Sequence, residues 1–396
     1  MTLKKIIQKK NLTIIGLNSG TSADGLDMAV VRYKKDAKRP AIKFIEGKTV
    51  SYPKSLQIRI NNALSRKDTP IENIIELDRQ LGRFYGEQAA KYCTYLKNKN
   101  IKPDLMASHG QTILHLPGKI KIGKKLESGT LQLGHPESIA EKTGLVTVAD
   151  FRQADIASGG EGAPITSLAM YYFLGDRKKN RLIINIGGIA NYFLFPKKNP
   201  LNNMTARDCG PGNSLMDILT QKYFGKKYDR GGRLASKGKI SMRMLSVLLA
   251  DNFLKGKYGP STGRERFGLK FVDKIVKAGK KLRLNKYDIL ATVTELTAVA
   301  ISEVVGFELD KYDIKDVYLL GGGARNKFLV KRLKVNLPDV KLFSVDRLKH
   351  NPDYLEAACY AVMGGLTIDT KPAGVPHITG AAGMTITGRI VQPMGE

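Results

Sequence analysis

Two apolar strand-like segments, one in each half of the chain, are each followed by a glycine-containing turn and a second strand-like segment. In the first half these strands are residues 13–17 and 26–33. In the second half they are residues 182–186 and 189–195, joined by Gly187-Gly188. Their apolar, β-branched composition predicts strands, and the turn residues between them predict hairpins. Because the plan occurs twice, it predicts a duplicated architecture, although the two sequences barely match.

Segments with helical periodicity lie between these hairpins and after them. Apolar residues recur at helical spacing in five segments, residues 53–98, 244–253, 271–279, 289–307 and 355–366. A third buried strand is predicted at residues 317–320, before a helix that begins near Asn326. Strands that alternate with helices predict an α/β fold whose sheets are covered on both faces. The length of 396 residues favours two domains over a single core.

The formal net charge of +29 is the least expected property of the chain. Such a charge can attract nucleic acid, an acidic surface or anionic small molecules. The basic residues are scattered and are not interleaved with aromatic residues, so we do not expect nucleic acid as the main partner. A lysine-rich composition spread over a solvated surface is the simpler interpretation.

The sequence lacks the marks of secreted and membrane-bound proteins. No apolar stretch approaches the roughly 18 residues of a membrane helix. The apolar run at residues 12–17 is short, and no cleavage site follows it. Cys93, Cys209 and Cys359 show no paired spacing, which fits a reducing compartment and argues against disulfides and structural zinc. We therefore expect a cytoplasmic protein without membrane attachment.

Three glycine turns follow predicted strands, where backbone amides can approach a phosphate. The first is Ser19-Gly20-Thr21-Ser22-Ala23-Asp24-Gly25, in which Asp24 is a candidate metal ligand. The second surrounds Gly187-Gly188, and the third is Gly321-Gly322-Gly323, just before the helix that begins near Asn326. Each alone could be an ordinary turn, and none has the spacing of a Walker loop or a dinucleotide site. Together they indicate nucleotide binding.

Two carboxylates are candidate acid–base groups. Asp208 precedes Cys209-Gly210-Pro211-Gly212-Asn213 and then an apolar helical run. Its carboxylate is either an N-cap of that helix or a general base that takes a proton from water or a hydroxyl group. Glu356 heads the last long helix, where an acid also complements the helix dipole. The sequence leaves both alternatives open for each residue.

Side chains suited to a sugar or an anion occur at two further places. His109, Gln111 and Thr112 can hydrogen-bond sugar hydroxyls, although a lone His in a loop is otherwise a local cap. Arg152 of Asp150-Phe151-Arg152 can bind a carboxylate or phosphate through two hydrogen bonds. A surface ion pair between Arg152 and Asp155 is the plain alternative. The polar segment 261–265 is turn-like and ambiguous by itself.

In this order, the motifs resemble those of the anhydro-N-acetylmuramic acid kinase family. The resemblance extends from Gly16 to Gly383 and also covers residues 130–134, 261–265 and 379–381. One glycine motif would be weak support, whereas the ordered set is specific.

The resemblance implies a two-domain actin-like ATPase (ribonuclease H-like) α/β fold with a nucleotide cleft between the domains. Domain I would comprise residues 1–147 and 368–396, and domain II residues 148–367. The resemblance also implies ATP and Mg²⁺ as cofactors and a homodimer. The implied reaction opens the 1,6-anhydro bridge of a recycled cell-wall sugar with water and phosphorylates its O6, which gives N-acetylmuramic acid 6-phosphate.

The resemblance also assigns roles by position. Asp208 would be the base that activates water, and Glu356 a second acid of the site. The ATP-binding residues would be Gly16, Ser19, Gly20, Thr21, Ser22, Asp24, Gly25, Gly187, Gly188, Gly321, Gly322, Gly323 and Asn326, with Asp24 also holding the metal. The residues near the sugar would be His109, Gln111, Thr112, Asp150 and Arg152.

The sequence departs from the family pattern at three positions. Asn18, Cys209 and His135 stand where family members usually have Met, Thr and Asp. These departures leave open an actin-like kinase that phosphorylates another sugar or acid without hydrolysing an anhydro bond. A basic module that binds nucleotide or nucleic acid is the alternative from a different class.

Overall fold

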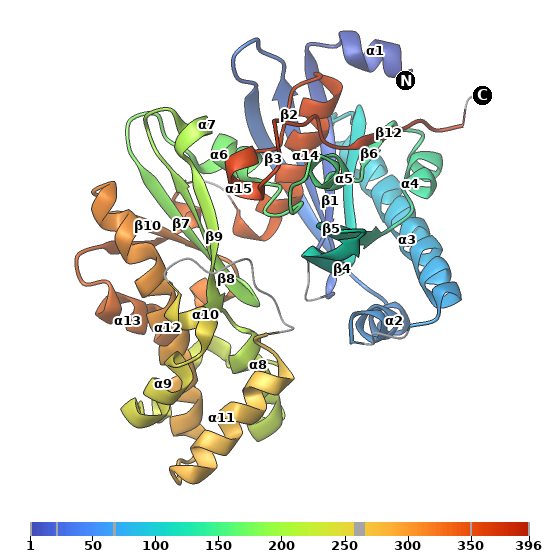
Figure 1. Ribbon diagram of the computed structural model, residues 1–396. Helices are drawn as coiled ribbons and strands as arrows, with labels where there is room; N and C mark the ends of the chain where they lie inside the picture. Colours follow the sequence, from blue (N-terminus) through green and yellow to red (C-terminus); the bar gives the residue numbers. More distant parts are fainter. Residues whose placement is uncertain (1, 21–22, 66–68, 257–265, 349–350, 395–396) are drawn as a thin grey trace. The chain divides into compact units, whose positions relative to one another are not determined.

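The structure is a computed structural model that describes residues 2–20, 23–65, 69–256, 266–348 and 351–394. The chain divides into two compact units, Met1–Phe173 with Asp353–Glu396, and Leu174–Pro352. Each unit contains one β-sheet (Figure 1) and is described by itself. Residues 148–173 and 353–367 belong to the first compact unit, while the predicted domain boundaries stay a prediction.

The sheet of the first unit has the strand order β12-β6-β4-β1-β2-β3, and β5 pairs with β4. Its strands are β1 (Asn11–Ser19), β2 (Gly25–Lys34), β3 (Ala41–Ser51), β4 (Leu105–Ile122), β5 (Lys125–Leu133), β6 (Thr147–Ala149) and β12 (Arg389–Val391). β1, β2 and β3 form an antiparallel meander. β4 runs parallel to β1, and β6 runs parallel to β4.

Helices cover both faces of this sheet. The helices of the unit are α1 (Leu3–Gln8), α2 (Lys54–Ser65), α3 (Ile71–Asn98), α4 (Pro136–Thr143), α5 (Gln153–Ala157), α6 (Ser167–Leu174), α14 (Leu355–Ile368) and α15 (Pro376–Thr379). Of these, α2 and α3 pack on one face and α14 on the other. Ile15 and Leu17 of β1 share a core with α2 and α3. Gly16 between them faces the opposite side, where a Cβ atom would lie 1.8 Å from the carbonyl oxygen of Ala357 in α14. The glycine therefore allows α14 to lie directly against β1.

The sheet of the second unit has the strand order β11-β10-β7-β8-β9. Its strands are β7 (Arg181–Ile186), β8 (Ile189–Phe195), β9 (Thr205–Pro211), β10 (Asp316–Leu320) and β11 (Lys341–Ser344). β7, β8 and β9 form an antiparallel meander, β10 runs parallel to β7, and β11 runs parallel to β10. The first unit has the same plan in β1, β2, β3, β4 and β6. This repetition confirms the duplicated α/β architecture that the two hairpins predict.

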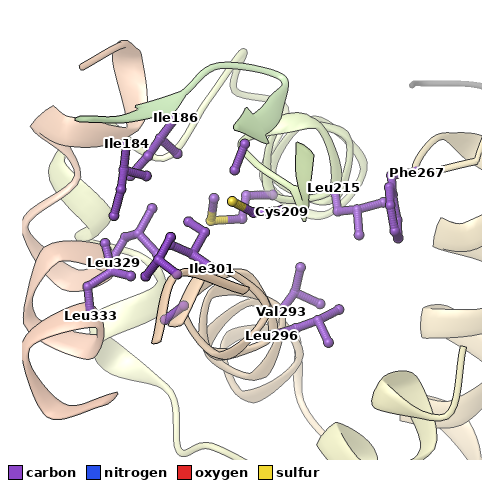
Figure 2. Close-up of a cluster of buried hydrophobic side chains, with 14 of the residues drawn as sticks. Ile184, Ile186, Cys209, Leu215, Phe267, Val293, Leu296, Ile301, Leu329 and Leu333 are labelled. Carbon is purple, nitrogen blue, oxygen red and sulfur yellow. The ribbon is translucent and has the colours of Figure 1, made fainter. Parts of the chain in front are cut away.

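The core of the second unit lies between its sheet and its helices. These are α7 (Pro200–Asn203), α8 (Ser214–Phe224), α9 (Met242–Leu249), α10 (Asn252–Lys255), α11 (Leu269–Lys281), α12 (Lys286–Lys311) and α13 (Lys327–Asn336). Figure 2 shows Ile184 and Ile186 of β7 facing side chains of α12 and α13. Among the described residues, α12 alone is long and apolar enough to cross a membrane, and 78% of its most apolar window is buried. It is therefore a core helix.

Most predicted elements are confirmed, with corrections. The helical segment predicted at 53–98 contains two helices, α2 and α3. The single helix predicted at 244–253 is two helices, because the Asp251 side chain accepts a hydrogen bond from the Phe253 amide and caps α10. His109 lies inside a strand, because β4 extends from Leu105 to Ile122. Gly110, with φ of 77°, lies at the register shift between β4 and β1. The interpretation of His109 as a loop cap is therefore wrong.

Candidate functional site

The predicted site residues of the first unit gather at the carboxyl ends of β1, β4 and β6. Ser19 ends β1 and pairs with Gln111 of β4, while Arg152 follows β6. Because these strands are parallel, their carboxyl ends share one edge of the sheet, where α/β proteins commonly bind ligands. Glu356, in the first turn of α14, hydrogen-bonds Asn18 of β1 and joins the same edge.

A buried chain of hydroxyl groups fixes the start of the first glycine turn. The Ser19 hydroxyl donates to Oε1 of Gln111 at 2.5 Å and accepts from the Tyr52 hydroxyl at 2.7 Å. The Tyr52 and Tyr85 hydroxyls lie 2.7 Å apart. Burial raises the pKa of Tyr52 to about 12 and that of Tyr85 well above its usual value, so both stay protonated. Gln111 also donates to the Gly20 carbonyl at 3.4 Å.

The end of the same turn presents a carboxylate. Nε2 of Gln57 in α2 donates to the Ala23 carbonyl at 3.0 Å and lies 3.4 Å from Oδ1 of Asp24. The Asp24 side chain is exposed. A Cβ atom at Gly25 would lie 2.4 Å from the Val50 carbonyl oxygen, so glycine is needed where β2 and β3 begin to pair. The local structure therefore holds the backbone and leaves the carboxylate accessible.

His109 and Arg152, both predicted to lie near the sugar, are in direct contact. Nε of Arg152 donates to Nε2 of His109 at 3.0 Å, and its NH1 donates to the Gly162 carbonyl at 3.1 Å. Since Nε2 of His109 accepts, Nδ1 carries the proton and donates to the Gly110 carbonyl at 3.1 Å. Burial, and then the Arg152 charge, lowers the pKa of His109 well below its usual range. His109 is therefore a neutral ring, stacked on Tyr360 at a centroid distance of 4.4 Å.

Asp155 anchors the glycine-rich loop at residues 159–164, which follows Arg152 in the sequence. The buried Asp155 carboxylate accepts from the Gly162 amide at 2.8 Å and from the Thr379 hydroxyl at 2.7 Å. In the described part of the chain, Arg152 bonds His109 and Gly162 instead of Asp155. The predicted alternative, a surface ion pair between Arg152 and Asp155, is therefore wrong, because Asp155 is committed to organising the loop.

Asp150 and Thr112 have local partners. Oδ2 of Asp150 lies 3.0 Å from Nε of Arg389 in β12. The Thr112 hydroxyl accepts from Nε2 of Gln132 in β5 at 3.3 Å. The first contact joins the segment after β6 to β12, and the second joins β4 to β5. Each residue therefore contributes to the stability of the fold without a ligand.

Glu356 is a carboxylate with a perturbed pKa. The residue is exposed to solvent at the edge of the sheet. Protein atoms packed around its carboxyl group nevertheless remove part of the hydration of the charged form, which raises the pKa of Glu356. The positive charge of Arg152 and the hydrogen bond from Asn18 act in the opposite direction. A carboxyl group in this balance can change protonation state during a reaction, a property common at catalytic sites.

In the second unit, two glycine segments are hydrogen-bonded to each other. The Gly187 carbonyl accepts from the Asn213 amide at 2.8 Å. The Gly188 carbonyl accepts from the Gly212 and Ser214 amides at 3.0 and 3.1 Å. A Cβ atom at Gly212 would lie 2.3 Å from the Gly187 carbonyl oxygen, so only glycine permits this approach. The turn after β7 is thereby fixed to the start of α8.

The third glycine turn lies against the same place. Gly321 has a φ of 83°, and a Cβ atom there would lie 2.6 Å from Oδ1 of Asn185. At Gly323 a Cβ atom would lie 2.2 Å from Cγ2 of Ile186. Asn213 donates through Nδ2 to the Ile186 carbonyl at 3.0 Å. The three motifs of the second unit therefore meet at the carboxyl end of β7.

Asp208 lies within β9 and lines a small pocket. Other residues around this pocket are Lys255 of α10 and Glu303 of α12. The N-cap position of α8 is Asn213, five residues later, so the N-cap interpretation of Asp208 is wrong. The next side chain, Cys209, points into the core (Figure 2), where burial raises the pKa of its thiol well above the usual range.

Comparison with known proteins decides the family. The sequence model of anhydro-N-acetylmuramic acid kinase matches residues 12–393. The chain belongs to the anhydro-N-acetylmuramic acid kinase family. The kinase of that name from Caldanaerobacter subterraneus subsp. tengcongensis is 36% identical over 395 residues, which are 98% of this chain and 99% of the relative. The corresponding protein of Clostridioides difficile is 34% identical over 96% of this chain and 99% of its own length.

Membership of the anhydro-N-acetylmuramic acid kinase family confirms the predicted family and the enzyme class. The chain is a phosphotransferase that uses ATP and a small sugar. This family member carries all the predicted motifs, although Thr21, Ser22 and residues 261–265 lie outside the described residues. Asn326, predicted to bind the cofactor, caps α13 by accepting a hydrogen bond from the Leu329 amide at 3.0 Å.

Sequence reasoning missed several residues of this kinase. Tyr52, Tyr85 and Tyr360 belong to no motif and come close to Ser19 or His109 only in the fold. Glu303 is an exposed residue of α12 that lines the same pocket as Asp208. No sequence motif marks these residues.

Proposed function

We propose that the chain opens the 1,6-anhydro bridge of 1,6-anhydro-N-acetylmuramic acid with water and phosphorylates O6 with ATP. The product is N-acetylmuramic acid 6-phosphate, and the role is the recycling of cell-wall amino sugar. The observation that carries this proposal is the family match over residues 12–393. The position of Asp208 in a pocket supports it, because a general base must face a cavity where water can stand.

Asp208 is the proposed general base. Its carboxylate accepts a proton from water as the water oxygen bonds to the anomeric carbon. The bond between that carbon and O6 breaks, and the electron pair on O6 forms the new bond to the γ-phosphorus of ATP. ADP leaves, and Asp208 ends the step protonated. Phosphoryl transfer itself requires mainly positioning and charge neutralisation.

The first unit supplies the proposed sugar-binding groups. Arg152 is oriented by His109, Gly162 and Tyr360. Its guanidinium has five N–H donors, so donors are left for a substrate oxygen. Gln111 and Thr112 follow His109 on β4, and Asp150 follows β6. Glu356, with its raised pKa, is the proposed second acid. Its role is to exchange a proton with a sugar oxygen.

The glycine turns are the proposed ATP-binding elements. Gly187-Gly188 and the turn from Ser19 to Gly25 would hold phosphates, and Gly321-Gly322-Gly323 with Asn326 the nucleoside end. The donor set fits Mg²⁺, because Mg²⁺ typically takes one or two carboxylates together with phosphate oxygens. Asp24 is exposed, and its charge helps to raise the pKa of nearby Asp27. When bound, the ion neutralises charge between the phosphates.

Four broader predictions accompany this function. The chain is proposed to be a cytoplasmic homodimer that does not use nucleic acid. Its actin-like domains are proposed to be residues 1–147 with 368–396, and 148–367. Light scattering after size-exclusion chromatography tests the dimer, and a monomer at all concentrations would contradict it.

The experiment that tests the function measures ADP release with Mg-ATP and the anhydro sugar, and identifies the product by mass spectrometry. The expected product has gained both water and a phosphoryl group. A product that has gained only the phosphoryl group, or turnover only with ordinary N-acetylated hexoses, would instead support a kinase without ring hydrolysis.

Asp208→Asn supplies the matched variant. It keeps the shape of the side chain but removes the base, so turnover is expected to fall at least about 100-fold. Binding of ATP is expected to remain, and circular dichroism checks that the variant is folded. Undiminished turnover would refute the role of Asp208.

A further inference from the structure

Helix α11 of the second unit presents a row of lysines to solvent. Lys270, Lys274, Lys277 and Lys281 recur at intervals of four, three and four residues, so they lie on one helix face. All four are exposed, and the row is roughly 16 Å long at 1.5 Å per residue. Asp273 is the only acid in α11, and no lysine of the row forms an ion pair within the described residues.

Further basic residues lie near the carboxyl end of the lysine row. Lys280 is in the last turn of α11, Arg283 and Lys286 follow the helix, and all three are exposed. Nζ of Lys286 lies 4.8 Å from the ring centroid of Phe224, the last residue of α8. We call the set Lys270, Lys274, Lys277, Lys280, Lys281, Arg283 and Lys286 the α11 basic face.

Aliphatic side chains are exposed next to the α11 basic face. Leu269, the first residue of α11, is 72% exposed. Helix α9 packs against α11 and exposes Met242 to 68% and Val247 to 60%. Large aliphatic groups in water are unfavourable by roughly 25 cal/mol for each Å². A surface that offers both anionic charge and an apolar interior would cover these aliphatic groups as well as the lysines.

We propose that the α11 basic face docks this enzyme on a bilayer that contains anionic phospholipid, so that reversible peripheral binding replaces the expectation of a protein without membrane attachment. The apolar face of α11 stays in the protein core, and a cluster of exposed lysines on such a helix is suited to attraction by anionic headgroups. A nucleic acid fits less well, because the face has one arginine for bidentate phosphate contacts and its exposed aliphatic groups would find no partner on a phosphodiester backbone. Docking gives part of the +29 charge a specific use.

The test is sedimentation of the full chain with vesicles. Phosphatidylcholine vesicles are compared with vesicles of phosphatidylcholine mixed with phosphatidylglycerol, at low and high salt. The protein is expected to sediment only with the anionic vesicles and to be released by salt. Equal binding to both kinds of vesicle, or binding to neither, would overturn the proposal.

A pair of charge-matched variants locates the surface. The first changes Lys270, Lys274, Lys277 and Lys281 to Gln, and the second changes the exposed Lys43, Lys91, Lys97 and Lys102 of the first unit to Gln. The first is expected to lower vesicle partitioning at least about tenfold, since each lysine near an anionic bilayer contributes about 1 kcal/mol. The second is expected to partition like the wild type. Equal losses would mean that total charge, and not the α11 basic face, controls binding.

Two further measurements show whether a loss of vesicle binding reflects damage to the enzyme or a preference for nucleic acid. Kinase activity in solution is expected to be unchanged in both variants, because α11 carries none of the proposed site residues. Single-stranded RNA and duplex DNA are tested beside the vesicles. If nucleic acid binds through α11 while anionic vesicles do not bind, the occupant is nucleic acid and the lipid proposal is wrong.

Discussion

Nε of Arg152 donates a hydrogen bond to Nε2 of His109 at 3.0 Å, so the arginine and the imidazole form one unit beneath the edge of the first sheet. The contact selects the tautomer that carries its proton on Nδ1, and that proton goes to the Gly110 carbonyl. A protonated imidazole would lose the bond from Arg152 and place two positive charges in contact. The pair therefore orients Arg152 only while His109 is neutral.

The first prediction concerns acid sensitivity. The folded pKa of His109 is far below its usual value of 6.5, chiefly because the ring is buried. As the pH falls through the unfolded value, the unfolded chain binds a proton that the folded protein does not, so acid destabilises the fold. His109→Gln is expected to unfold with a shallower dependence on pH between about 7.5 and 5. Urea denaturation at several pH values measures this, and identical slopes for variant and wild type would contradict it.

The second prediction separates a role in catalysis from a role in folding at Glu356. Burial raises the pKa of this carboxyl group from 4.5, so its contribution to stability is fully present below the unfolded pKa and is lost as the pH rises through the folded pKa. Glu356→Gln keeps the side chain neutral and is expected to unfold at a temperature no lower than the wild type at neutral pH. Turnover is expected to fall about 100-fold or more. A variant that is much less stable but fully active per folded molecule would show that Glu356 is structural.

The third prediction concerns the buried hydroxyl chain. Tyr52→Phe removes the donor to Ser19 and the partner of the Tyr85 hydroxyl. Since both groups are buried, the expected loss is about 1–3 kcal/mol in the free energy of unfolding. The KM for ATP is expected to rise, because Ser19 begins the proposed phosphate turn. Tyr228→Phe, at a residue 54% exposed, is the control and is expected to stay within about 0.5 kcal/mol of the wild type.

Local patterns predicted much of this fold. Strands β7 and β8 and helix α14 follow from runs of apolar residues and their spacing, because each is buried along most of its length. Asp208 was harder to place, since a polar residue before a helical run fits an N-cap as well as it fits a position inside β9. The chain Ser19–Tyr52–Tyr85 could not be predicted, because its members are brought together by the tertiary fold and Tyr52 lies 33 residues from Ser19.

The last prediction compares two glycines. Gly16→Ala would place a methyl group 1.8 Å from the Ala357 carbonyl oxygen, and backbone on both sides cannot move aside cheaply. We expect a loss of about 3 kcal/mol or more in the free energy of unfolding. The variant is also expected to lose turnover, because displacing α14 displaces Glu356 from Asn18.

Gly306→Ala provides the matched control, since a Cβ atom there would meet nothing within 4 Å inside helix α12. Alanine is the better helix former, so this variant is expected to gain about 0.5–1 kcal/mol. Thermal and urea unfolding with the sugar-dependent ADP assay measure both variants. If Gly16→Ala were as stable as Gly306→Ala, α14 would not lie directly on β1, and the placement of Glu356 at the edge of the first sheet would be wrong.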